Sequence, residues 1–431
     1  MAKTVNIPKP TSRLLLKKVT CPHCWSEFEP SDICWISRSE ELIGDFLLGE
    51  TEYERFLPAR FHSDGNAVDR KGVICHEFAC PNCHLKLPPC VLETRPFFIS
   101  IVGAPASGKS YFLAAMTYQM ERMYGEKFHI SFTDADPQMN RRLSDYVTLQ
   151  FRNGDPNALV KIDKTEEQGD LYNTIFKDGQ QITYPQPFIF SLMPLSGHQY
   201  ENQRQTVATS LCLYDNAGES YLPAEGADRS SLPVTRHLGR SNTIFFLFDP
   251  LQDNRLRELC RGVSEDPQLQ ERMTGDFRRS PFRQEQVLNE MVKRTRQFRN
   301  MTTTAKYPLP VVVIVTKFDA WFKLVPDIPR VHPWTKAPGT DERILDEKVF
   351  KEISRVTRNF LLKRTSEIVY SIESFASDVT YIPVSATGTP PVVDPQTQES
   401  GFRAGSIRPV WVELPILYAL AKSNRGIVPI Q

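Results

Sequence analysis

The residues best suited to chemistry lie in one segment, residues 103–110, which reads GAPASGKS. Two glycines at this spacing let the backbone curl, so that successive N–H groups face one anion. The Lys109 ammonium can reach the β- and γ-phosphates of a nucleotide, and the Ser110 hydroxyl can ligate the Mg²⁺ ion that bridges them. We therefore expect a phosphate site with Lys109 in a catalytic role. Its expected ligands are Gly103, Ala106, Ser107, Gly108, Lys109, Ser110 and Tyr111.

A second motif, DNAG at residues 215–218, follows an apolar run. An aspartate at a strand end with a glycine three residues later is suited to holding Mg²⁺ and to sensing a γ-phosphate. Asp215 and Gly218 are the residues expected in these roles. Glu219 comes next and is a candidate catalytic residue near the attacking water; a charged side chain that merely faces solvent is an equal alternative.

The segment TKFD, residues 316–319, predicts which base is bound. The Asp319 carboxylate can accept hydrogen bonds from guanine N1–H and its exocyclic amine, whereas adenine presents an acceptor there. The Lys317 stem can cover the ring. Thr316 replaces the commoner asparagine, so one base contact is lost or rebuilt. A later S-A-T segment offers backbone N–H groups to guanine O6. Its residues are Ser385, Ala386 and Thr387.

Residues 124–187 are polar, rich in turn formers and weakly periodic, so no compact strand–helix unit is expected there. In a switch protein this interval supplies a threonine whose hydroxyl completes the Mg²⁺ shell. Thr165 is the residue expected to bind Mg²⁺. Thr174 and Thr183 remain alternatives, and Thr133 is less suited because it lies close to the first helix. For any one of them, a solvated loop residue is the alternative that the polar sequence favours.

Four cysteines near the N-terminus form two matching C-P-x-C pairs, Cys21 with Cys24 and Cys80 with Cys83. Such pairs aim four thiolates at one ion, which predicts a structural zinc ribbon with no open position for substrate. The residues between the pairs, 25–79, exceed the usual spacing and predict an inserted cap. Substitute ligands nearby in sequence are His23, His76, His84, Cys34, Cys75 and Cys90.

The elements that must position these residues are apolar strands and amphipathic helices. Nearly continuous apolar runs predict parallel strands that are covered on both faces. The expected strands are 97–102, 188–194, 209–214, 242–249 and the apolar part of 308–319, with a short strand near 381–385; the expected helices cover 284–300, 344–360 and 416–422. Residues 325–339 and 389–395 are expected to be connectors. The fold class is α/β, with a ribbon region at 1–95 and a nucleotide domain at 96–424 that includes a helical insert at 250–306.

Composition is that of an ordinary globular protein of 431 residues, with 52 basic and 51 acidic side chains and a net charge of +1. No global field would attract DNA, RNA or an anionic membrane. The short apolar run near the N-terminus predicts no signal peptide, and no apolar run reaches the length of a membrane span. Nine cysteines, an odd number, fit metal binding in a reducing compartment. We therefore expect a cytoplasmic protein without membrane contacts.

The ordered motifs GAPASGKS, DNAG, TKFD and SAT resemble the translation-factor-related (TRAFAC) class of P-loop GTPases over residues 97–422. Together with CPHC and CPNC, they make the chain similar to the double-GTPase group of bacterial conflict systems. The resemblance implies a three-layer α/β sandwich that binds GTP or GDP with Mg²⁺, beside a Zn²⁺ ribbon. It also implies a GTPase that is slow without a partner and acts as a switch in conflict, antiviral defence or signalling, with a GTPase-associated protein or a second GTPase as partner.

Two other functions remain open from the sequence. A non-hydrolysing scaffold could hold GTP as a structural ligand while the ribbon recruits a protein or, less expectedly, a nucleic acid. An ATP-driven P-loop enzyme is the second alternative, and Asp319 argues against it because a carboxylate would face the N1 acceptor of adenine.

Overall fold

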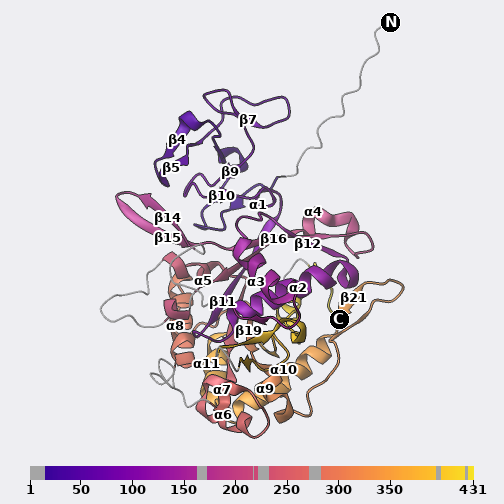
Figure 1. Ribbon diagram of the computed structural model, residues 1–431. Coiled ribbons are helices and arrows are strands. Elements are labelled where there is room, and N and C mark those ends of the chain that lie inside the picture. Colours follow the sequence, from indigo (N-terminus) through magenta and orange to yellow (C-terminus); the bar gives the residue numbers. More distant parts are fainter. Residues whose placement is uncertain are drawn as a thin grey trace.

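The computed structural model describes residues 15–162, 172–216, 218–221, 233–270, 283–394, 399–422 and 426–431 (Figure 1). Its centre is a seven-stranded sheet in the order β12-β16-β17-β11-β18-β19-β22. The strands are β12 (Ile130–Asp134), β16 (Phe188–Pro194), β17 (Thr209–Asp215), β11 (Arg95–Gly103), β18 (Thr243–Phe248), β19 (Val311–Val315) and β22 (Val379–Pro383). The fold is therefore mixed α/β, as the apolar runs predict.

Most neighbours in this sheet are parallel. β11 pairs in parallel with β17 and β18, and the parallel pairing continues through β19 to β22. β16 is antiparallel to both of its neighbours, β12 and β17. The five residues of β19, VVVIV, are all buried, as expected for a central strand covered on both faces.

Helices cover both faces of the sheet (Figure 1). The first, α2 (Lys109–Phe128), follows β11 and is buried on all sides over residues 112–117, with Met120 among the buried side chains further along. On the other side lie α5 (His237–Arg240), α8 (Arg283–Phe298) and α11 (Ser366–Phe375). The C-terminal helix α12 (Leu414–Lys422) packs against β19. It begins with Leu414, so Pro415 lies in its first turn, where a missing backbone N–H costs no hydrogen bond within the helix.

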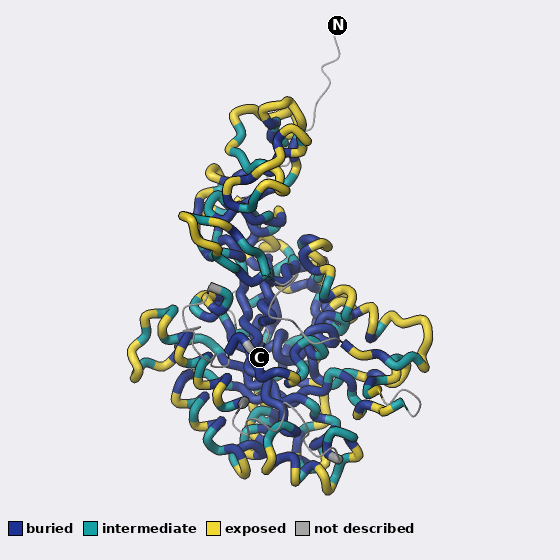
Figure 2. Tube along the Cα trace, turned by 60° about the vertical axis from the view of Figure 1, so that its left-hand side comes forward, coloured by how far each residue is buried: buried dark blue, intermediate teal, exposed yellow. Residues whose placement is uncertain are grey.

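The N-terminal module, residues 15–94, is a narrow lobe on top of this body (Figure 2). It holds a four-stranded sheet, β10-β9-β3-β6. The strands are β10 (Lys86–Leu87), β9 (Phe78–Ala79), β3 (Cys34–Ile36) and β6 (Arg55–Phe56). Residues of the expected insert therefore share a sheet with the second cysteine pair. A continuous cluster of buried side chains joins the module to the central sheet, including Trp25 from the module and Phe98, Ile189 and Tyr214 from the sheet.

The interval 124–187 is more structured than its sequence indicates, so that prediction was wrong. It contains the edge strand β12, the helix α3 (Arg141–Phe151) and a hairpin of β14 (Tyr172–Lys177) and β15 (Gln180–Pro185). α3 is short, and its buried apolar residues are Leu143 and Val147. Two apolar positions are too few to show a helical period in the sequence. β12 forms because β16 offers it a free edge.

Two smaller predictions also need correction. The helix expected at 344–360 is α10 (Glu347–Leu362), because the Asp346 carboxylate caps it by accepting from the N–H of Val349 at 3.2 Å. The preceding residues form β21 (Arg343–Leu345), which pairs with β20 (Trp334–Lys336) inside the expected connector. The connector at 389–395 likewise contains β23 (Val392–Val393), which pairs with β24 (Ser400–Arg403).

The structure describes three α-helices within residues 250–306, the expected insert, together with turns and loops. The helices are α6 (Asn254–Arg261), α7 (Pro267–Gln270) and α8. Across the described parts of the chain, no helix is both long enough and apolar enough to cross a bilayer.

Candidate nucleotide-binding site and cysteine cluster

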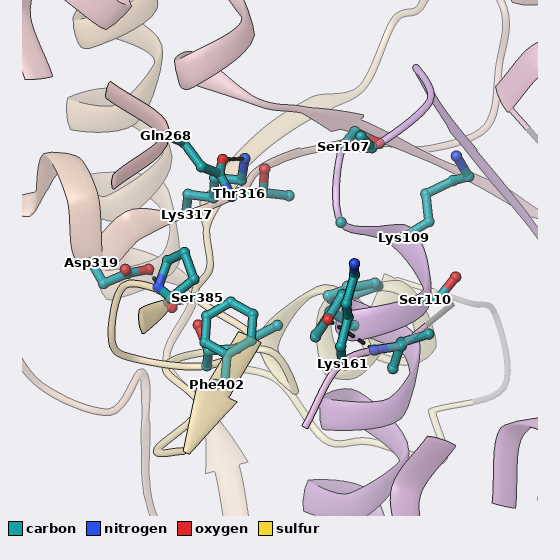
Figure 3. A pocket seen from close by; sticks show the side chains of 18 of the residues that line it. Ser107, Lys109, Ser110, Lys161, Gln268, Thr316, Lys317, Asp319, Ser385 and Phe402 are labelled. Carbon is teal, nitrogen blue, oxygen red and sulfur yellow. Dashed lines mark hydrogen bonds between the residues drawn. The ribbon is translucent and has the colours of Figure 1, made fainter. Parts of the chain in front are cut away.

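The sequence motifs meet at one edge of the central sheet. The segments that follow β11, β19 and β22 line one cavity of about 410 Å³. Its wall includes the phosphate loop, Gly218, the TKFD segment and the S-A-T segment (Figure 3). Parallel strands end at the same edge of a sheet, which is where α/β folds bind ligands. Residues more than 270 positions apart in the chain are thus brought together around a volume suited to a small molecule.

The phosphate loop has the curled backbone that its glycines predict. Ala106 and Gly108 have positive φ angles of 60° and 89°. The Lys109 ammonium is buried and donates to the carbonyl oxygens of Gly103 at 3.1 Å and Ala104 at 3.4 Å. The ammonium thus lies over the loop itself, where phosphate oxygens can replace the two carbonyl groups as its partners.

Gly218 packs directly on this loop. A Cβ atom added to Gly218 would lie 2.5 Å from the backbone nitrogen of Pro105 and 2.8 Å from the Gly103 oxygen. Gly103 itself is confined by the side chains of Ser107 and Leu247, at 2.7 and 3.1 Å from an added Cβ. Only glycine permits this approach. A shift of the phosphate loop would therefore displace Gly218 in the DNAG segment.

Asp215 is buried at the end of β17, and its Oδ1 has no hydrogen-bond partner. Burial raises the pKa of this carboxyl to about 6, although the charges of Lys109 and Arg142 oppose the shift. A buried carboxylate oxygen without a donor is suited to a cation. The unpartnered Oδ1 is compatible with the expected role of Asp215 as a Mg²⁺ ligand, whereas the cavity lining includes Ser110 but not Asp215.

The expected third Mg²⁺ ligand, Thr165, lies outside the described residues. The alternatives Thr174 and Thr183 face each other across the β14–β15 hairpin, with their hydroxyl oxygens 3.3 Å apart. Thr133 is in the edge strand β12. None of these three described threonines lines the cavity.

Glu219 lies in η4 (Gly218–Tyr221), and its side chain is outside what the structure describes. The end of this turn is held by Arg294, a buried residue of α8. Its guanidinium donates to the carbonyl oxygen of Ser220 at 2.8 Å and pairs with Glu290 at 2.7 Å. The DNAG turn is therefore fixed to the phosphate loop at one end and to α8 at the other.

At the opposite end of the cavity, the Ser385 hydroxyl donates to Asp319 Oδ1 at 2.5 Å. The same hydroxyl accepts from the N–H of Gly388 at 2.8 Å, so the S-A-T turn and the TKFD turn are linked. Burial raises the pKa of Asp319, while the Ser385 hydrogen bond and Lys317 oppose the shift. A ligand that donates hydrogen bonds would stabilise the charged form of this partly desolvated carboxylate.

Lys317 has the unusual backbone φ of 54°. Its ammonium lies 2.6 Å from Asp249 Oδ2 and donates to Gln268 Oε1 at 2.7 Å. The Thr316 hydroxyl is turned toward the sheet and donates to the carbonyl oxygen of Phe248 at 3.3 Å. The Lys317 residue thus lines the cavity, and its charge is held in place by two partners outside the motif.

Further side chains in the wall come from segments without a recognisable motif, among them Lys161, Asp266, Gln268 and Phe402. Lys161 directly follows β13 (Leu159–Val160), which pairs with β24, the strand that carries Phe402. In Figure 3 the Lys161 amine points into the cavity, and the Phe402 ring lies across the opening from Thr316. No signal in the sequence could have identified Lys161 and Phe402, because only the two-residue pairing of β13 with β24, about 240 positions later, brings them together.

The four cysteines of the two C-P-x-C pairs form one cluster, in which all sulfur atoms lie within 4.8 Å of one another. Cys21 Sγ is 3.8 Å from Cys83 Sγ, and Cys24 Sγ is 3.7 Å from Cys80 Sγ. Zn–S bonds of about 2.3 Å in a tetrahedron place sulfur atoms about 3.8 Å apart. The donor set and its spacing therefore fit one structural zinc ion.

Each pair lies at the tip of a short hairpin. β1 (Val19–Thr20) and β2 (Glu27–Phe28) flank the first pair, and β9 and β10 flank the second. Trp25 and His84 follow the pairs with left-handed φ angles of 58° and 60°. Backbone N–H groups of His23 and Asn82 lie 3.3 and 3.4 Å from the Cys21 and Cys80 sulfurs, which stabilises thiolates.

Two of the substitute ligands, His23 and His84, are engaged elsewhere. His84 Nδ1 lies 2.7 Å from Asp45 Oδ2, and His23 Nε2 lies 3.1 Å from the Lys86 carbonyl oxygen. Burial lowers the pKa of His23 to about 4. Among the described residues, the group able to hold a metal consists of the four cysteines alone.

Metal analysis of the purified protein is expected to give about one zinc per chain, because four thiolates close the site. Cys21→Ser and Cys80→Ser should each lose the zinc, and the N-terminal module should unfold first, since site formation and folding are coupled. Cys260→Ser, in α6 and away from the cluster, is the matched control. Protein that holds no metal when prepared without chelator would contradict the site.

One side chain connects the cysteine cluster to the start of the DNAG segment, whose Gly218 lines the cavity. Tyr214 precedes Asp215 on β17, and its hydroxyl donates to the Pro22 carbonyl at 2.6 Å while accepting from Trp25 Nε1 at 3.0 Å. Its ring stacks on His237, with ring centres 4.8 Å apart. His237 Nε2 in turn accepts from the Asn216 amide at 2.9 Å. Burial lowers the pKa of His237 to about 3, so the ring is neutral at physiological pH.

The β14–β15 hairpin makes a second connection to the N-terminal module. The N–H of Phe176 donates to the Leu47 carbonyl at 2.7 Å, and Lys177 donates to Asn82 Oδ1 at 2.9 Å. Asn82 also donates to Cys24 Sγ at 3.4 Å. The module therefore contacts both the strand that carries Asp215 and the hairpin that follows residues 163–171.

Comparison with known proteins gives limited similarity. No family model matches the chain. A curated protein of Mycolicibacterium smegmatis, described as "Putative ESX-1 scaffolding and assembly protein SaeC", is 28% identical over 179 residues, which are 42% of this chain and 40% of that protein. The chain thus matches less than half the length of this relative.

Two solved structures align weakly. Sup35 complexed with GDP is 12% identical, with a TM-score of 0.21, over 68% of this chain and 38% of that one. A protein from Thermus thermophilus is 9% identical, with a TM-score of 0.24, over 78% and 40% of the two chains. TM-scores this low carry no conclusion about fold or function.

Proposed function

We propose that the chain binds GTP with Mg²⁺ and hydrolyses it to GDP and phosphate, as a molecular switch that regulates a partner protein. The observation that carries this proposal is the cavity that joins a phosphate loop at one end to Asp319, held by Ser385, at the other. In this proposal, the phosphate loop binds the phosphates of a guanine nucleotide, and Asp319 in the same cavity wall accepts from its base.

Each residue has a defined task in this proposal. Backbone N–H groups of the loop and the Lys109 ammonium bind the β- and γ-phosphates, and the Gly218 N–H meets the γ-phosphate. Ser110 and Asp215 would hold Mg²⁺, with Thr165 as the proposed third ligand; the ion, when bound, neutralises phosphate charge. Glu219 is proposed to act near the attacking water. Asp319 accepts from guanine, and Ala386 N–H donates to its O6.

The switch proposal is supported by the contacts of the N-terminal module. A nucleotide-dependent shift of the DNAG segment would move Asn216 and Tyr214, which contact His237 and the first cysteine pair. We propose that the module presents this state to a protein partner, a GTPase-associated protein or a second GTPase. Its setting in bacterial conflict, antiviral defence or signalling is proposed from the motif resemblance. The module carries more acidic than basic side chains, which disfavours nucleic acid as its partner.

The second candidate function is a scaffold that holds GTP without hydrolysing it. The partial relative described as a scaffolding and assembly protein favours this alternative. Here the cavity, the base contacts and the zinc site would be unchanged, and the difference would lie only in the catalytic step.

Phosphate release under single-turnover conditions separates the two functions. A GTPase should convert bound GTP to GDP and phosphate, and EDTA should stop the reaction because Asp215 and Ser110 act through Mg²⁺. Asp215→Asn should abolish turnover, while Asp327→Asn, an exposed substitution outside the cavity, should not. GTP recovered intact after prolonged incubation with Mg²⁺ would favour the scaffold.

A further inference from the structure

The TKFD segment leaves one polar contact with the base unfilled. Thr316, at the head of the segment, donates its hydroxyl to the Phe248 carbonyl and is almost fully buried. Its hydroxyl hydrogen is therefore already engaged and does not donate to a base in the cavity. Another polar side chain in the same wall is Gln268, which comes from α7 in the helical insert.

We propose that Gln268 is a base-reading residue, whose side-chain amide donates a hydrogen bond to N7 of the bound purine. This inference rests on the proposed function, because it assumes that Asp319 holds the opposite edge of the same base. It assigns part of the nucleotide specificity to the helical insert.

The orientation of the Gln268 amide follows from its neighbour. The Lys317 ammonium has only donors, so the atom that faces it at 2.7 Å is the oxygen Oε1. The NH₂ group of Gln268 is therefore directed away from Lys317. Asp249 Oδ2 holds the same ammonium at 2.6 Å, so the lysine cannot turn away without losing two partners.

The backbone around Gln268 is equally fixed. Its N–H donates to Asp266 Oδ1 at 2.8 Å, and its carbonyl oxygen accepts from the Arg257 guanidinium. Arg261 of α6 donates to the next carbonyl, that of Leu269, at 2.9 Å. Together these contacts hold α7 against α6. The Gln268 side-chain amide therefore loses less conformational entropy when it binds a ligand.

The chemistry of the base completes the argument. Guanine presents the donors N1–H and N2–H₂ on one edge, where Asp319 accepts, and the acceptor N7 on another. A carboxylate on the first edge and an amide donor on the second are complementary to one purine in one orientation. Glutamate at position 268 could accept from Lys317 but would have no donor for the base, and it would add a second carboxylate beside Asp249.

The test compares GTP with 7-deaza-GTP, in which a C–H replaces N7. Calorimetric titration of the full-length parent protein should show about tenfold weaker binding of 7-deaza-GTP, the effect of one lost hydrogen bond. Gln268→Ala and Gln268→Glu should each bind GTP about tenfold more weakly and should no longer distinguish the two nucleotides. Gln180→Ala, an exposed substitution in the β14–β15 hairpin, should behave like the parent.

Failure of this inference is distinguishable from failure of the proposed function. If the parent selects GTP over ATP but binds 7-deaza-GTP as tightly as GTP, Gln268 does not read N7 and the inference is overturned. If the parent shows no selection between GTP and ATP, the proposed function itself is wrong. The nucleotide comparison on the parent needs no variant, so a substitution that unfolds the protein cannot obscure the result.

Discussion

Lys109→Ala should weaken GTP binding by about two orders of magnitude and reduce hydrolysis below detection, the loss expected for charge-assisted hydrogen bonds to phosphate. Lys109 begins α2 directly after the loop, and its ammonium lies over the carbonyl oxygens that phosphate oxygens would replace. The same charge serves bound GTP and its transition state, so affinity and rate should fall together. Equilibrium titration and single-turnover phosphate release measure the two effects.

Lys351→Ala is the matched control for this variant. Lys351 lies on α10 with an exposed side chain that pairs with Glu347, so its loss removes one positive charge without touching the cavity. Equal melting temperatures would show that the Lys109 variant is folded. Undiminished GTP binding by folded Lys109→Ala protein would mean that the phosphates bind elsewhere.

Asp319→Asn is expected to change which nucleotide is preferred. The Ser385 hydroxyl donates to Oδ1 and would keep the asparagine oxygen in that position, so the new NH₂ group would face the base. A donor amide would then meet the donors of guanine, and GTP binding should weaken by about 2 to 4 kcal/mol. Xanthosine triphosphate carries an oxygen in place of the guanine amine, so the variant should prefer it.

The affinity of the variant for xanthosine triphosphate should approach that of the parent for GTP, because the phosphate loop is unchanged. Asp327→Asn, with an exposed side chain outside the cavity, supplies the control for a lost carboxylate. A folded Asp319→Asn protein with the base preference of the parent would show that the carboxylate does not read the base.

The parts that sequence could predict are those with strong local patterns. The buried strands β11, β18 and β19 are nearly continuous apolar runs, and the four cysteines repeat an identical C-P start. Their positions follow from burial on both faces of a parallel sheet and from the ligand spacing of zinc. The meeting of the motifs at one edge follows from the parallel order of the strands.

The parts that sequence could not predict depend on long-range pairing. β13 and β24 are too short to give a recognisable strand pattern in the sequence. Their pairing nevertheless brings Lys161 and Phe402 to the cavity. Gln268 acquires its role only because Lys317 and Asp249 hold its oxygen in place. The β14–β15 hairpin carries a mixed polar pattern because it packs partly against the N-terminal module.

Selection of guanine is the central claim, and nucleotide competition on the parent protein tests it most directly. Labelled GTP bound to the zinc-loaded protein with Mg²⁺ is displaced by unlabelled GTP, GDP, ATP or ADP in turn. We predict displacement by GTP and GDP at concentrations at least about a hundredfold below those of ATP and ADP, because adenine places an acceptor against the Asp319 carboxylate. Displacement by ATP at the same concentration as GTP would contradict the account.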